Sequence, residues 1–437
     1  MGVLGWVRNR RNGRPRPGDG PPAPLALEPP APSGWGRTLS SLAIPDFRML
    51  VSGLILSMAG MQIGIVARSW LAYDISGSGL TLGLVAIANG LPWLLMSLVA
   101  GVAADRFDKR KVLIFTQAGL GTLALVNAVL VHAGIVQVWH LVALSLLQGA
   151  IFALDVPTRL AYIPQLVGRE QLSNAIAVHA AAMNVNRVLG PVIAGVLIVW
   201  NPAIAFYAVA ALYGGAALAL LRLPRGRAAA GVRKGTLAEI VLGCRYIWGE
   251  RALRILLAMA FIPVLLGMPF QQLLPVFQAA VFHVGPDSLG LMYTAVGIGS
   301  LAGSLGTARF ADHRRRGLLQ MVGGVGFGVT LLLFALSTRY EVALALLVVV
   351  GLASQAYMTI NSVLIMLHTD KQFYGRVMSV YMMTWSLMPI ATLPLGALVD
   401  IVGAPATVAG AGALLAALMA LVAALYPSQG TSKTKQG

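Results

Sequence analysis

Charged side chains are scarce in this sequence. Asp, Glu, Lys and Arg make up 11% of its residues, whereas 57% are hydrophobic. A soluble globular domain carries roughly a quarter charged residues. A chain so poor in charge cannot cover a surface that faces water, and its mean hydropathy of +0.78 fits surroundings of lipid. The composition therefore predicts an integral membrane protein.

Acidic residues are rarer than basic ones, 15 against 32, which gives a formal net charge of +17. In a soluble protein such an excess suggests nucleic-acid binding. Here the basic residues lie in short clusters between apolar stretches, without interleaved aromatic residues. That pattern is typical of loops facing an anionic membrane leaflet. Membrane lipids are therefore the expected partner, and nucleic acid is not.

Cysteine is nearly absent, and the lone Cys244 excludes an intrachain disulfide and a cysteine-based metal site. The six histidines are scattered, with no pair at the spacing of helical metal ligands. The sequence also lacks a Gly-rich phosphate loop ending in Lys-Ser/Thr and a Ser-His-Asp set. We expect no metal, no cofactor, no ATP-driven step and no enzymatic activity.

Long apolar runs, by contrast, fill most of the chain. A membrane-spanning helix needs about 20 mostly apolar residues. Twelve runs meet this need, at 49–73, 81–103, 111–132, 138–160, 172–199, 203–222, 253–281, 289–311, 317–337, 341–365, 375–399 and 404–426. The predicted fold is all-α, with twelve transmembrane helices.

The charges between these runs indicate the orientation. Alternate loops carry the basic residues, and the loops between them carry almost none, with Arg339 as the exception. By the positive-inside rule the basic loops and both termini face the cytoplasm. We expect a multi-pass protein of the plasma membrane, in bacteria the inner membrane.

The longest charged connection divides the chain into two halves. We expect a basic cytoplasmic tail at 1–40, a six-helix bundle at 41–222, a cytoplasmic linker at 223–252, a second six-helix bundle at 253–427 and a tail at 428–437. Part of the linker, around 237–247, has the pattern of an amphipathic helix at the membrane interface. The segments GVAADRFDKRK (101–111) and ARFADHRRR (308–316) resemble each other, which indicates two pseudo-symmetric repeats with a cargo site between them.

The first of these segments resembles the signature between helices 2 and 3 of the major facilitator superfamily, G-x-x-x-D-R-x-G-R-[RK]. The matching residues are Gly101, Asp105, Arg106, Lys109 and Arg110, and Asp108 replaces the usual glycine. Shorter motifs resemble the branch of bacterial enterobactin exporters and related drug-efflux proteins. They are PDFR at 45–48, Asp155-x-Pro157-x-Arg159, Asn184-x-x-Arg187-x-x-Gly190-Pro191 and GRVMS at 375–379. The resemblance covers about 41–427 and implies this fold and a transport function.

In that superfamily the signature acts as a cytoplasmic latch. The resemblance implies that Asp105 caps the N-terminus of a helix in the other half, and the helix beginning near Gly375 is the candidate. Asp312 takes the corresponding place in the weaker second copy. The plainer alternative is a basic loop that only sets topology.

Asp155 is the acidic residue well inside an apolar run. Ionising a carboxyl group in lipid is expensive, so this side chain should be protonated or paired. One interpretation makes it a proton carrier, and the other makes it a fixed ion-pair partner of Arg159 or Lys109. Arg187 also lies deep in a helix, near Gly190, Pro191 and Gly195, which allow close helix packing. It is expected to serve the gate or the cargo, or to pair structurally, with Asp155 for example.

The cargo cavity is expected between the halves. Arg68 is interpreted either as a side chain reaching the outer membrane surface or as a contact for anionic cargo. The other residues predicted to line the cavity are amides and aromatics, which suit bulky amphipathic molecules. They are Gln62, Gln148, Phe152, Gln271, Gln272, Gln355, Tyr357, Asn361 and Trp385.

The leading functional hypothesis is a secondary active transporter, functional as a monomer, that exports a small amphipathic compound in exchange for protons. The compound is either drug-like or siderophore-like. A transporter of lysolipid-like molecules is the alternative, and a membrane sensor without transport is a third. Uptake and release measurements on cells with and without the protein separate these classes.

Overall fold

The computed structural model describes residues 40–168, 170–226, 236–310, 316–385 and 387–425, except the side chains of 97–106, 236–240, 308–310 and 371. Within these residues, twelve helical spans are long and apolar enough to cross a membrane, which confirms the predicted number. All regular elements of the described residues are helical. The predicted tails at 1–40 and 428–437 lie almost entirely outside these residues.

The first half contributes six spans. They are α2 (Pro45–Ser76), α3 (Gly79–Arg106), α4 (Lys109–His132), α5 (Val138–Val167), α6 (Leu172–Trp200) and α7 (Pro202–Leu220). The short helix α8 (Thr236–Gly249) follows. The second half contains α9 (Arg251–Ile262), η2 (Pro263–Gly267), η3 (Met268–Leu273), α10 (Leu274–Val276), η4 (Phe277–Val281), α11 (Pro286–Phe310), α12 (Arg316–Leu336), α13 (Tyr340–Leu367), η5 (Lys371–Phe373), α14 (Tyr374–Trp385), α15 (Met388–Val402) and α16 (Ala404–Leu425).

Local sequence explains where several helices begin and end. Gly77 ends α2 with a φ of 60°, a left-handed conformation that costs glycine little. Asp108 precedes α4, and its carboxylate accepts a hydrogen bond from the backbone N–H of Arg110 at 3.0 Å. Asn201 caps α7 in the same way through the N–H of Ala203 at 2.8 Å. Such caps satisfy N–H groups that have no partner within the helix.

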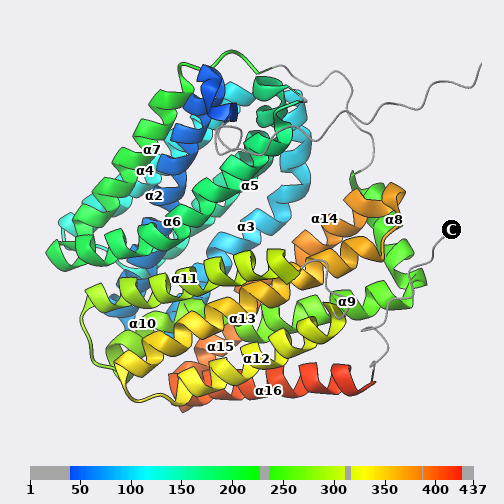
Figure 1. Cartoon of the computed structure of the whole chain (residues 1–437). Coiled ribbons are helices and arrows are strands. Elements are labelled where there is room, and N and C mark those ends of the chain that lie inside the picture. The colour runs from blue at the N-terminus through cyan, green and yellow to red at the C-terminus, as the bar shows by residue number, and fades with distance from the viewer. Residues whose placement is uncertain (1–39, 169, 227–235, 311–315, 386, 426–437) are drawn as a thin grey trace, which may run out of the picture.

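The helices form two groups, which Figure 1 shows on either side of an oblique boundary. Helix pairs α3–α5, α4–α7, α2–α7 and α2–α6 pack within the first group, called here the N-bundle (α2–α7). Pairs α11–α13, α12–α16 and α12–α13 pack within the second, the C-bundle (α9–α16). The bundles meet chiefly through α3 against α15 and α6 against α11.

The first span of the C-bundle is not a regular α-helix. Between Arg251 and Val281 it passes through two π-helical stretches and one 3₁₀ stretch. Pro263, Pro269 and Pro275 lie in this span, and each removes a backbone donor from the hydrogen-bond ladder. The prolines thus explain why this span departs from α-helical geometry.

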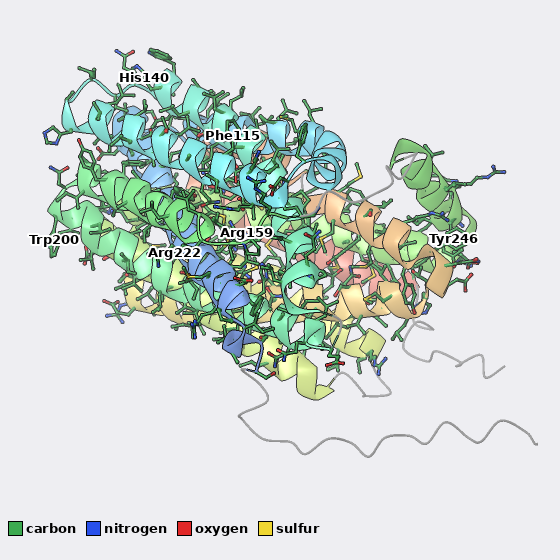
Figure 2. All side chains as sticks on the ribbon, turned by 90° about the horizontal axis from the view of Figure 1, so that it is seen from above. Phe115, His140, Arg159, Trp200, Arg222 and Tyr246 are labelled. Atoms are coloured by element: carbon green, nitrogen blue, oxygen red, sulfur yellow. The ribbon has the colours of Figure 1, made fainter. Side chains whose placement is uncertain are left out.

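The outer surface of the bundles is apolar. Phe115 is 67% exposed and Ile401 78% exposed, and many Leu and Val side chains also point outward. Figure 2 shows Phe115 on an outer helix, whereas Arg159 lies inside. Lipid rather than water suits such a surface.

The two ends of the spans differ. The tight-loop end is defined by the short connections at 77–78, 133–137, 201, 282–285, 337–339 and 403. The basic end is defined by the connections near 107–108, 168–171, 221–250 and 368–370. Figure 2 shows His140 and Trp200 toward the tight-loop end and Tyr246 at the opposite, basic end.

Candidate functional site

The contact between α3 and α15 depends on small residues. An added β-carbon on Gly79 would lie 2.7 Å from the carbonyl oxygen of Gly396, and one on Gly83 would lie 2.7 Å from Cα of Leu393. A β-carbon on Gly90 would lie 2.2 Å from the ring of Pro389. Larger side chains cannot fit at these positions without displacing a helix. The two bundles are thus in backbone contact from the tight-loop end toward the middle of α3.

The second contact between the bundles joins α6 and α11, and it uses Gly195, one of the two glycines singled out in the sequence, together with Gly290. A β-carbon on Gly290 would lie 2.5 Å from the carbonyl oxygen of Pro191, and one on Gly195 would lie 3.0 Å from that of Asp287. Gly190 instead faces Gln62 of α2 within the N-bundle. Pro191 and Gly195 therefore lie in the seam between the bundles, whereas Gly190 packs inside one bundle.

Polar contacts also cross the seam near its middle. The guanidinium of Arg187 donates to Oε1 of Gln355 at 3.2 Å. The hydroxyls of Ser69 and Tyr293 lie 3.4 Å apart, and that of Tyr293 donates to the carbonyl oxygen of Gln271 at 2.7 Å. Arg187 is thus bonded to a neutral amide of the other bundle. The pairing with Asp155 considered from the sequence is not formed, because Asp155 has other partners.

At the tight-loop end, a carboxylate joins the two bundles through hydrogen bonds. Asp400, near the C-terminus of α15, accepts hydrogen bonds from the hydroxyl of Ser78 at 2.6 Å and from the backbone N–H groups of Gly79 and Leu80 at 2.6 and 3.1 Å. The carboxylate thereby caps the N-terminus of α3, where free N–H groups and the helix dipole favour an anion. One bundle supplies the charge and the other supplies the helix end.

Asp155 lies inside the N-bundle, fully buried and fully partnered. Its carboxylate accepts from the hydroxyl of Thr116 at 2.7 Å and from the amide of Gln117 at 2.8 Å, both on α4. Arg159, one turn along α5, forms a salt bridge with it at 3.0 Å. Four donor atoms from three side chains surround the carboxylate, which is the geometry of a fixed ion pair.

The C-bundle has a neutral counterpart of this network. The amide of Gln320 on α12 donates to Oδ1 of Asn361 on α13 at 2.6 Å, and both residues are fully buried. Tyr357, one turn earlier on α13, donates its hydroxyl proton to the carbonyl oxygen of Met259 at 2.7 Å. Tyr357 and Asn361 therefore lie inside the C-bundle rather than on the surface facing the N-bundle. This differs from their predicted place in the cavity.

Arg68 does not reach the membrane surface; it lies inside the N-bundle and is 8% exposed. It donates to the hydroxyl of Ser145 at 3.3 Å, whereas its Nε has no hydrogen-bond partner among the described residues. A cavity of about 10 Å³ adjoins it, lined also by Asn127, Gln148 and Tyr213. That volume suits about one water molecule. Arg68 and Gln148 thus belong to an internal polar cluster.

The remaining predicted cavity residues are partly exposed. Gln62, Phe152, Gln271, Gln272, Gln355 and Trp385 are neither fully buried nor fully exposed. Of these, Gln355 takes part in a contact that crosses the seam, whereas Gln271 accepts from Tyr293 within the C-bundle. Their role in binding cargo stays a prediction.

At the basic end, Gly101, Asp105, Arg106 and Asp312 lie outside the residues whose side chains are described. The described part of the motif is tied to the segment after α7. The carboxylate of Asp108 accepts from the N–H of Gly226 at 3.0 Å, and Arg110 donates to the carbonyl oxygen of Leu221. Lys109 is buried beside Gly226. The aspartate that replaces the usual glycine thus serves as a helix cap.

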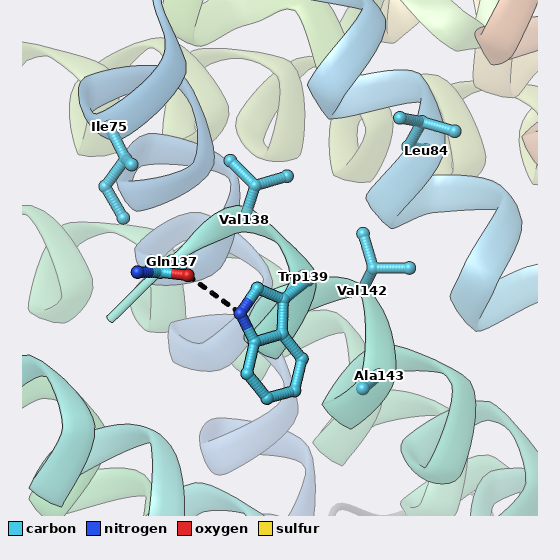
Figure 3. Close-up of a pocket in the computed structure, with 7 residues that line it drawn as sticks. All are labelled: Ile75, Leu84, Gln137, Val138, Trp139, Val142 and Ala143. Carbon is cyan, nitrogen blue, oxygen red and sulfur yellow. Dashed lines mark hydrogen bonds between the residues drawn. The ribbon is translucent and has the colours of Figure 1, made fainter. Parts of the chain in front are cut away.

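A larger recess opens on the outside of the N-bundle, at the tight-loop end (Figure 3). It has a volume of about 690 Å³, and its walls are almost entirely apolar. Trp139 borders it and donates its indole N–H to Oε1 of Gln137 at 2.8 Å. The recess is lined by Ile75, Leu84, Gln137, Val138, Trp139, Val142 and Ala143. All of these belong to the first half of the chain.

Sequence reasoning missed Asp400 and Tyr293. Asp400 is an acidic residue at the end of an apolar run, and Gly77-Ser78-Gly79 offers a short polar turn. These signals are visible in the sequence, but only the packing of α3 against α15 joins them. Tyr293 carries no signal of its own, because aromatic residues are common in spanning helices.

These features define a membrane transporter built of two six-helix bundles that meet along a closely packed seam. The chain belongs to the transmembrane secretion effector family of the major facilitator superfamily, which it matches over residues 36–434. It is 28% identical over 366 residues to the multidrug efflux pump Tap of Mycolicibacterium fortuitum, covering 80% of this chain and 88% of that protein. It is 27% identical over 392 residues to the enterobactin exporter EntS of Citrobacter koseri, covering 85% and 89% of the two chains.

The solved structures it resembles share its fold. The nucleoside transporter NupG superposes with a TM-score of 0.68 at 15% identity, covering 87% of this chain and 98% of that one. A bacterial homologue of the lysosomal transporter Spinster, solved in an inward-facing, unoccupied conformation, gives a TM-score of 0.68 at 14% identity, with coverage of 90% and 97%. These proteins are all membrane transporters, and the chain is a transporter, not an enzyme.

Proposed function

We propose that this protein is a proton-coupled exporter that moves small amphipathic compounds, drug-like or siderophore-like, by alternating access. The observation that carries this proposal is the seam. Its contacts across the bundles include backbone-to-glycine packing, the hydrogen bond between Arg187 and Gln355, hydroxyl contacts of Ser69 with Tyr293 and of Thr294 with Val188, and one helix cap. Separating the bundles would break no salt bridge among the described residues, because the Asp155–Arg159 pair lies inside the N-bundle. The names of the relatives support export of drug-like or siderophore-like cargo.

The proposed orientation places the basic end and both termini in the cytoplasm. The described contacts between the bundles then seal the outer side, from Asp400 to Arg187. This arrangement corresponds to a conformation that accepts cargo from the cell interior or from the inner leaflet. Arg187, Gln271 and Gln355 would then lie at the closed apex of the cargo path. Rocking of the two bundles about this site would carry the cargo outward.

Accumulation measurements test the proposed function. Cells without the protein should retain more of a fluorescent amphipathic drug or of their own siderophore than cells that express it. Dissipating the proton gradient should remove the difference, because coupled export requires the gradient. Lysolipid is the third compound of the panel. Lysolipid as the only exported compound would favour the lipid-like alternative, and an unchanged panel would contradict export.

Reporter fusions test the orientation. A reporter inserted at Gly285, in the connection between η4 and α11, should be read on the outside of the cell. One inserted at Gly231, after α7, should be read in the cytoplasm. In the proposed topology one span, Arg251–Val281, separates the two sites. Detection of both reporters on one side of the membrane would contradict this topology.

A further inference from the structure

Helix α8 has an outward face that is unusually apolar for a segment between two bundles. Val241 is 63% exposed and Trp248 75% exposed, and Leu242, Cys244 and Arg245 are exposed beside them. At 100° per residue these five side chains occupy one continuous side of the helix. A side facing water would carry several charges, whereas this one carries only Arg245. Its chemistry is that of a helix lying in the membrane interface.

The position of α8 places this face at the membrane boundary. The helix ends at Gly249, and the next membrane span begins at Arg251. Tryptophan is enriched at the boundary between lipid headgroups and hydrocarbon, and arginine there reaches anionic headgroups. Figure 1 shows α8 at the edge of the molecule, beside α14.

The opposite face of α8 is fixed to α14. A β-carbon on Gly243 would lie 3.1 Å from Cβ of Arg376, so the two helices touch. The ring of Tyr246 stacks on that of Phe373 with centroids 4.1 Å apart and planes 11° from parallel. Arg376 in turn lies over the ring of Phe373 at 5.4 Å.

Two further contacts strengthen this junction. The N–H of Asp370 donates to the hydroxyl of Tyr246 at 3.2 Å. Ile247 is buried in one apolar cluster with Val377 and Tyr381 of α14. The segment from Asp370 through η5 contacts α8 through backbone and ring, and α14 contacts it through apolar side chains. A displacement of α8 would therefore displace the start of α14. This start is the helix end that the latch aspartate is expected to cap.

We propose that α8 is a membrane-binding strap: its outward face binds an anionic phospholipid surface through Arg245, Trp248 and Val241, and the bound helix holds α14 in place. The composition of the leaflet at the basic end thereby adjusts the position of the helix that gates the transporter. The strap does not depend on which cargo is carried or on which ion drives it.

The single cysteine offers a probe on the strap itself. A nitroxide attached to Cys244 of the full-length protein is followed in nanodiscs of phosphatidylcholine with rising fractions of phosphatidylglycerol. The label should become immobilised and more accessible to oxygen than to a water-soluble nickel chelate as phosphatidylglycerol increases. In Arg245→Gln the required lipid fraction should rise about fivefold, because one basic residue at an anionic surface contributes roughly this factor.

Arg225→Gln is the matched control, since Arg225 is also basic and exposed near the same end but precedes the strap. It should leave the lipid titration unchanged. A label that stays in water at every lipid composition would overturn the proposal. So would an Arg225→Gln shift as large as that of Arg245→Gln.

Hydrogen exchange then tests the connection to α14. Amides of 374–385 should be better protected in phosphatidylglycerol nanodiscs than in phosphatidylcholine alone. In Phe373→Leu, which removes the ring stack, this lipid dependence should be lost while the nitroxide on Cys244 still becomes immobilised. If amide protection of 374–385 in the unaltered protein is the same in both lipid compositions, the proposed strap is refuted.

Discussion

Asp155→Asn should abolish uphill export and cargo counterflow together. The asparagine keeps the size of the side chain but leaves the guanidinium of Arg159 as a buried charge without its counterion. Breaking a buried ion pair in this way costs about 3–5 kcal/mol. The lost stability should appear as a lower unfolding temperature, and both transport modes should fall by about tenfold or more. Proteoliposomes with matched amounts of inserted protein give both rates.

The double variant Asp155→Asn/Arg159→Gln is the control for the charge. It removes both ions, so it should regain much of the unfolding temperature that the single variant loses. The opposite interpretation, a proton carrier, makes a different prediction. Counterflow needs no net movement of protons, so a carrier variant would keep counterflow and lose only uphill export. That result would show that the network around Asp155 releases its proton during transport.

Gly290→Val should hold the seam open at the tight-loop end and stop transport. The new side chain would place its β-carbon 2.5 Å from the carbonyl oxygen of Pro191, where no flexible group can move aside. Overpacking of this kind costs about 1–3 kcal/mol, which lowers the population of the closed conformation by roughly 5- to 150-fold. Accessibility of the seam is measured with Ser69→Cys in a protein whose own cysteine is removed by Cys244→Ser. In the Gly290→Val variant, the thiol at position 69 should become reactive toward an impermeant reagent added on the tight-loop side.

Gly306→Val provides the comparison on the same helix. A β-carbon there meets no atom of the described structure within 4 Å, so the change tests the valine without the clash. It should leave both transport and the reactivity at position 69 unchanged. Equal losses in the two variants would mean that α11 tolerates no valine at all, and the seam would not explain the result.

The number of spans and the burial of Asp155 with Arg159 follow from the sequence for clear reasons. Lipid demands long apolar helices, and a carboxylate four residues from an arginine on one helix has a partner within reach. The surroundings of Arg68 and the inward position of Tyr357 and Asn361 do not follow. Helices such as α2 and α13 are apolar on nearly every side, so the sequence does not say which side faces lipid, cargo or the bundle interior.

Contacts between the bundles are harder still to predict. Arg187 and Gln355 are 168 residues apart, and Asp400 and Ser78 are 322 apart. Neither pair has a charge partner of opposite sign that would single it out. Only the crossing of α6 with α11 and of α3 with α15 brings them together.

The cap formed by Asp400 has a consequence for how such proteins diverge. Two of its three donors are main-chain N–H groups; any residue but proline supplies the one at position 80, whereas position 79 must stay glycine to fit against Gly396. On the α3 side only position 80 is therefore nearly free to vary, whereas the α15 side of the cap depends on the single carboxylate of Asp400. Under the proposed mechanism, a replacement of Asp400 would alter how readily the tight-loop end opens without altering any side chain predicted to meet cargo. Speed of transport and choice of cargo would then be open to selection independently of each other.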